Sequence, residues 1–70
     1  MLESYQSDEG YDVFVYYAKE IKDVASVLDQ FSKEYPNYTI LSWQLSVKVR
    51  DDEVLDVLTI FAKQVQKAGE

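Results

Sequence analysis

The densest group of residues that could do chemistry is the acidic run Asp51, Asp52 and Glu53, followed closely by Asp56. Neighbouring carboxylates can hold a hard cation or act as an acid and base pair. Their spacing does not match an EF-hand loop, which needs alternating oxygen ligands, a central glycine and a distant glutamate. The start of a helix explains the same acids through the helix dipole, so we expect no metal site here.

Other catalytic groups are scarce. The 70 residues include no histidine and no cysteine, which removes the commonest general base, thiolate metal ligands and disulfides. Serine and threonine nucleophiles therefore lack a histidine base, and the two glycines, Gly10 and Gly69, cannot form a phosphate-binding loop. We predict a protein that is not an enzyme and has no cofactor.

The chain is acidic, with 13 acidic and 7 basic residues and a net charge of -6. This charge disfavours binding to nucleic acid and to anionic lipid, because both depend on Lys and Arg displacing counterions. A protein target with a basic surface is the better match. The acids expected to contact such a partner are Asp8, Glu9, Asp12, Asp51, Asp52, Glu53 and Asp56.

The elements that must position these acids include one very long strand, Tyr38 to Arg50, in which apolar and polar residues alternate. At about 3.3 Å per residue it would be about 40 Å long, whereas a compact chain of this size has a radius of gyration near 11 Å. The strand must overhang, bend or be covered by a second molecule. The face expected to meet the core, with Trp43 as its anchor, carries Thr39, Leu41, Trp43, Leu45, Val47 and Val49.

The patterns predict one domain over residues 1–70. Its elements are a short edge strand or frayed tail over 1–10, a strand over 11–18, a helix over 19–35, the strand over 38–50 and a second helix over 51–68. In the first helix, Asp29 and Lys33 can pair one turn apart, and Pro36 ends the helix.

This order predicts a two-layer α/β (α+β) sandwich of the type (β)βαβα, with both helices on one face of the sheet. The apolar arc of the second helix would span about 220°, which one sheet face cannot cover. Two or three strands also make a poor sheet. We therefore expect the sheet to be completed by a homodimer.

The other face of this sheet is expected to be open, and six tyrosines in so short a chain favour a recognition surface. Its rings could fill a dimer interface, belong to a sheet buried on both sides, or form a platform on which nucleic-acid bases stack. The acidic charge disfavours the platform. The residues expected at the interface or open face are Phe14, Tyr16, Tyr38, Ile40, Gln44, Val57 and Ile60.

In size, charge and lack of catalytic groups the chain is similar in general character to small phage-encoded inhibitors, immunity proteins and DNA-mimicking proteins. We predict a small protein that binds and inhibits or regulates another protein, with nucleic-acid-binding proteins among the candidate targets. The alternatives are a self-assembling structural or adaptor module and, less favoured, an open-sheet nucleic-acid binder. The segment Met1 to Gly10 is unlike a signal peptide and no stretch could span a membrane, so we expect a cytoplasmic location.

Overall fold

The computed structural model describes residues 2–6 and 10–65. Within these ranges the chain forms four strands and one helix. In chain order they are β1 (Leu2–Gln6), β2 (Asp12–Ala18), α1 (Val24–Glu34), β3 (Tyr38–Arg50) and β4 (Glu53–Gln64).

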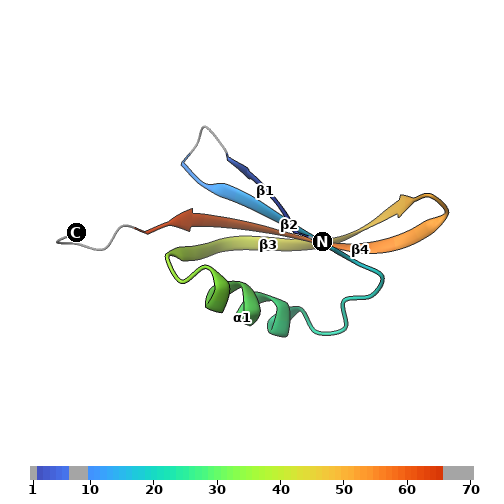
Figure 1. Ribbon diagram of the computed structural model, residues 1–70, viewed down its shortest axis with the longest axis horizontal. Coiled ribbons are helices and arrows are strands. Elements are labelled where there is room, and N and C mark those ends of the chain that lie inside the picture. Colours follow the sequence, from blue (N-terminus) through green and yellow to red (C-terminus); the bar gives the residue numbers. More distant parts are fainter. Residues whose placement is uncertain (1, 7–9, 66–70) are drawn as a thin grey trace.

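The strands form one sheet in the order β1-β2-β4-β3, and each neighbouring pair is antiparallel. The strands β2 and β3, which α1 connects, therefore run in the same direction with β4 inserted between them. The helix α1 lies on one face of the sheet (Figure 1). The protein is thus a small α+β domain with two layers, as predicted, but its layers are built from different elements.

The second predicted helix, over 51–68, is wrong for all of its described residues, because Glu53–Gln64 is strand β4. A sequence whose apolar residues would surround most of a helix also gives a strand with apolar residues on both faces. In β4 both faces carry buried apolar residues, with Leu58 and Ile60 on the α1 side and Val57 on the other. The β-branched residues of this segment, among them Val54, Val57, Thr59 and Ile60, favour the strand.

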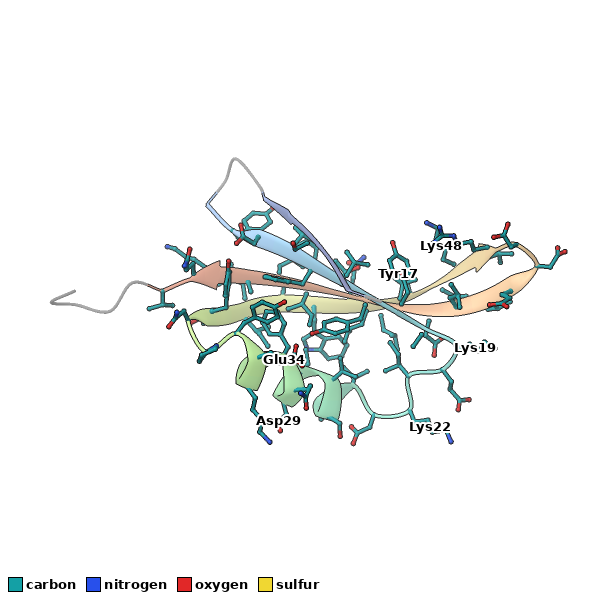
Figure 2. All side chains as sticks on the ribbon, viewed as in Figure 1. Tyr17, Lys19, Lys22, Asp29, Glu34 and Lys48 are labelled. Atoms are coloured by element: carbon teal, nitrogen blue, oxygen red, sulfur yellow. The ribbon has the colours of Figure 1, made fainter. Side chains whose placement is uncertain are left out.

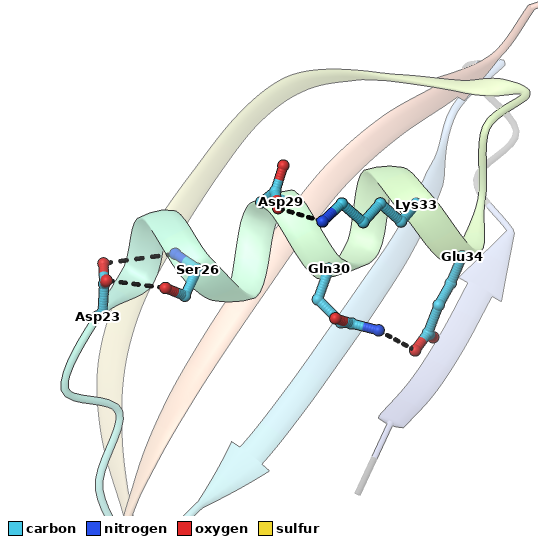
Figure 3. A network of polar contacts seen from close by, with 6 residues as sticks. All are labelled: Asp23, Ser26, Asp29, Gln30, Lys33 and Glu34. Atoms are coloured by element: carbon cyan, nitrogen blue, oxygen red, sulfur yellow. Dashed lines mark hydrogen bonds and ion pairs between the residues drawn. The ribbon is translucent and has the colours of Figure 1, made fainter.

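The first predicted helix is present but shorter than 19–35. Asp23 caps its N-terminus, where the Asp23 carboxylate accepts hydrogen bonds from the Ser26 hydroxyl, at 2.8 Å, and from the Ser26 backbone N–H (Figure 3). These bonds lower the pKa of Asp23, the hydroxyl contributing most. The predicted pair is confirmed, with Lys33 Nζ 3.1 Å from Asp29 Oδ2.

A β-bulge between Ile40 and Ser42 divides β3 into two parts with opposite alternation. Before the bulge, Tyr38 and Ile40 pack against the core cluster. After it, Trp43 pairs with Ile60 and Leu45 with Leu58, so these side chains share the α1 side of the sheet with the core residues of β4. The sequence pattern placed Tyr38 and Ile40 on the opposite face from Trp43, because it did not include the bulge.

The core lies between α1 and the sheet and consists of Phe14, Phe31, Leu58, Ile60 and Ala62. The Phe14 and Phe31 rings meet edge to face with centroids 4.7 Å apart. The rings of Tyr35 and Tyr38 lie 5.1 and 5.2 Å from that of Phe14. A cluster of four aromatic rings therefore packs at the C-terminal end of α1, beside the aliphatic core residues of β4.

The molecule is elongated, measuring 50 × 26 × 17 Å along its principal axes. The hairpin of β3 and β4 extends beyond β2 and α1 at the right of Figure 1. The sequence required the long strand to overhang, to bend or to be covered by a second molecule. In the structure β3 overhangs the rest of the domain.

Candidate protein-binding surface

Five apolar side chains form an exposed row on the α1 side of the β3–β4 hairpin. They lie on one face because Val49 pairs with Val54, Val47 with Asp56, Leu45 with Leu58 and Trp43 with Ile60. We call these residues the apolar row; their exposed fractions are Trp43 46%, Leu45 46%, Val47 64%, Val49 70% and Val54 60%.

The row is exposed because the helix is too short to cover it. With 11 residues α1 is about 16 Å long, whereas the 13 residues of β3 extend about 43 Å. The helix packs over the part of the sheet where Tyr38 and Ile40 lie. The segment before α1 reaches the same face where Ile21 bonds to Asp56, and neither element buries the apolar row.

The sequence pattern correctly placed the β3 residues of the row on one apolar face, but we expected that face to be buried. Trp43 in particular was expected to anchor the core and is almost half exposed. The predicted second helix was the element that would have covered the row, and that segment is β4 instead. The signal that could have revealed the row is the difference in length between the long strand and the first helix.

Three acids cluster at the end of the same hairpin and are all exposed: Asp51, Asp52 and Glu53, here called the tip acids. Arg50 pairs with Glu53 across a two-residue connection in which Asp51 has φ 50° and Asp52 has φ 65°. Two consecutive left-handed residues are the signature of a type I′ turn, and aspartate tolerates that conformation better than most residues. The tip acids were predicted as a helix start; Asp51 and Asp52 instead form a hairpin turn, and Glu53 begins β4.

The other acids expected to bind a partner have different positions. Asp56 is half-buried on β4 and its Oδ2 accepts a hydrogen bond from the Ile21 backbone N–H at 2.8 Å. Asp12 on β2 accepts a hydrogen bond from the Tyr38 hydroxyl. Both acids therefore hold the fold together, and Asp8 and Glu9 lie outside the described residues.

The predicted open-face residues are divided between the two faces. Phe14 and Ile60 are buried in the core, and Tyr16, Tyr38 and Ile40 pack against it on the α1 side, so for these five the expectation of an open face is wrong. The alternation of side chains along a strand shows which residues share a face. It does not show which face the helix covers. On the face without a helix lie Gln44, which is exposed, and Val57, which is buried.

That second face carries the cations of β3. Lys48 lies with Nζ 5.6 Å from the centroid of the Tyr17 ring, a cation–π contact that Figure 2 shows on the side of the sheet away from α1. The Tyr11 and Phe61 rings meet edge to face at 6.0 Å. Rings on this face therefore pack on each other and under a lysine.

Two tyrosines have raised pKa values. The hydrogen bond to Asp12 is the main reason that the pKa of Tyr38 is raised, with burial and the negative charge of Asp12 adding to it. Burial is the main cause for Tyr16, followed by the charge of Glu34 and by Tyr35. The Tyr16 hydroxyl is buried without a hydrogen-bond partner among the described residues.

In the described part of the chain, no three acidic, histidine or cysteine residues are grouped so that they could hold a metal ion. The only helix described there, α1, is neither long nor apolar enough to cross a membrane. Comparisons with protein-family models, curated proteins and solved structures find no match to this chain.

Proposed function

We propose that this chain is a non-enzymatic protein that binds another protein through the apolar row and thereby inhibits or regulates it. The observation that carries the proposal is that five neighbouring apolar side chains on one face are 46–70% exposed. Contiguous apolar patches on a monomer's surface, especially when polar residues border them, are typical of protein-binding sites. Here the tip acids form that border.

The row offers enough apolar surface to contribute to affinity. Fully burying a Val or Leu side chain is worth about 1.5–3 kcal/mol, so completing the burial of these partly exposed side chains contributes about 1 kcal/mol each. Trp43 lies at one end and presents a large, rigid ring, the residue type most enriched among binding hot spots. The entropic and desolvation costs of association reduce the net binding free energy below this sum.

The tip acids favour a partner with a basic surface. They lie at the end of the hairpin that carries the row, so a partner covering Val49 and Val54 would also come within reach of their carboxylates. Exposed charges of this kind mainly raise the association rate and select against acidic partners. This supports a basic target, including a protein that itself binds nucleic acid.

Capture of the partner with two matched double variants tests the proposal. Val47→Thr with Val49→Thr keeps the shape and β-propensity of the row but makes it polar. Gln44→Thr with Ser46→Thr alters exposed residues of the same strand on the opposite face. Tagged wild type and control are expected to capture the same protein stoichiometrically from nuclease-treated native lysate, and the row variant about tenfold less or worse.

Equal capture by both variants would contradict the role of the row. Loss of all captured material after nuclease treatment would favour the nucleic-acid alternative. The triple variant Asp51→Asn, Asp52→Asn and Glu53→Gln is expected to weaken binding and to flatten its dependence on salt. Asparagine is used because it also tolerates the left-handed turn, and Asp56 is left unchanged because it bonds to Ile21.

A second candidate function, self-association, is supported by a separate observation. In the described part of the chain, β3 is hydrogen-bonded to β4 and to no other strand, and it stands at the end of the strand order. A long strand with an unpaired edge offers backbone N–H and C=O groups to another strand. The homodimer expected from the sequence therefore remains a proposal, now assigned to this edge.

A further inference from the structure

We propose that the free edge of β3 pairs antiparallel with β3 of a second copy of this chain, with Ser46 on the two-fold axis. This inference rests on the self-association described above and specifies its geometry. It uses the edge of the hairpin, whereas partner binding uses its face. The two proposals therefore succeed or fail separately.

The position of the axis follows from where β3 is regular. The bulge between Ile40 and Ser42 interrupts the alternation at one end, and the strand ends at Arg50 at the other. The stretch from Ser42 to Arg50 has Ser46 at its midpoint. A two-fold axis at Ser46 therefore pairs the whole regular stretch with itself, and an axis at any other residue leaves part of it unpaired.

This register matches side chains by type on both faces. Directly opposed residues in an antiparallel pair lie on the same face. On the α1 side, Trp43 would oppose Val49 of the second copy, and Leu45 would oppose Val47 of the second copy. On the other side, Ser42 would oppose Arg50 of the second copy, and Gln44 would oppose Lys48 of the second copy.

Charge disfavours the registers centred on Lys48 and on Val49. An axis at Lys48 would place two lysines opposite each other, and an axis at Val49 would place Lys48 opposite Arg50. Like charges directly opposed destabilise a strand pair. With the axis at Ser46, every cation of this stretch meets a neutral side chain, and the tip acids extend toward the Thr39 and Lys63 pair of the second copy.

The dimer would have one continuous eight-stranded sheet with both copies of α1 on the same face, because the two-fold axis is perpendicular to the sheet. The two apolar rows would then lie side by side between the helices. The paired edge is about 30 Å long and one sheet thick, which is small for a specific interface. Association is therefore expected in the concentration range of about 10 μM to 1 mM.

Single cysteines test the register cleanly because the chain has no cysteine of its own. Opposed Cβ atoms in a strand pair lie about 4.5–5.5 Å apart, close to disulfide distance. Ser46→Cys is therefore expected to form the disulfide-linked dimer about tenfold faster than Ser42→Cys, or more. Ser42 is the matched control, since it is an exposed serine of the same strand and face whose two copies would be roughly 26 Å apart.

Sedimentation of the wild-type chain over the same concentrations tests whether it associates at all. Ser46→Lys, which opposes two cations at the axis, is expected to sediment as a monomer where wild type and Ser46→Thr sediment as dimers. A wild-type chain that stays monomeric to 1 mM overturns self-association. A dimer in which Ser42→Cys oxidises as fast as Ser46→Cys overturns this register, and neither result bears on capture of a different protein by the apolar row.

Discussion

Single acidic residues in this protein serve two separate purposes, which their contacts distinguish. Asp12 and Asp56 accept hydrogen bonds from Tyr38 and from the Ile21 backbone, and so connect β2 with β3 and β4 with the segment before α1. The tip acids are exposed in a turn. Composition alone predicted all of them as one partner-binding set, because residue type does not indicate which carboxylate has a donor nearby.

The hydrogen bond between Tyr38 and Asp12 is expected to contribute to the stability of the fold. Tyr38→Phe keeps the ring that packs 5.2 Å from Phe14 and removes only the hydroxyl. Because the bond is only part-buried, we expect the free energy of unfolding to fall by about 0.5–1 kcal/mol at pH 7. Urea unfolding of the two proteins measures the difference.

The same bond makes that difference depend on pH. The pKa of Tyr38 is raised in the folded state, so the folded protein holds this proton more tightly than the unfolded chain. Its contribution is complete below the ordinary tyrosine pKa of about 10 and is lost as the pH rises through the folded pKa above that value. The stabilities of wild type and Tyr38→Phe should therefore converge above pH 10, and a constant gap up to pH 11 would contradict the assignment.

Among the elements, the hairpin turn between β3 and β4 determines that the segment after it forms a strand and not the predicted helix. Asp51 and Asp52 can cap a helix or form a type I′ turn, and only the turn requires positive φ at both residues. Asp52→Gly and Asp52→Ala remove the same charge but differ in the Cβ atom that disfavours this conformation. We expect the glycine variant to be more stable than the alanine variant by about 1 kcal/mol in urea unfolding, and equal stabilities would contradict the turn.

Sequence patterns predicted some of these elements and missed others. Apolar period and flanking residues predicted the long strand and the apolar stripe of α1, including the Asp29 and Lys33 pair. They failed for β4, because a strand that is apolar on both faces has no distinct period and resembles a helix with a wide apolar arc. They also missed the bulge at Leu41, which reverses the alternation of β3 and has no marked local signal.

At the scale of the whole molecule, the mismatch between a short helix and a long hairpin determines the surface available for binding. The fold covers its aromatic core under α1 and leaves the apolar row without a second layer in the described chain. The sequence analysis missed the exposed row because the predicted second helix would have covered it, although the difference in length between β3 and α1 pointed to it. The proposed partner covers the row, and the proposed second copy pairs with its edge.

Trp43 gives the most direct test of partner binding, because it is the only tryptophan and belongs to the apolar row. We would replace it with 5-fluorotryptophan, which gives a single ¹⁹F resonance from the row, and add the purified captured protein at a fixed concentration of this chain, so that self-association stays constant. If the partner covers the row, the resonance is expected to shift in proportion to the fraction bound. A resonance that stays unchanged while the partner binds stoichiometrically would contradict it.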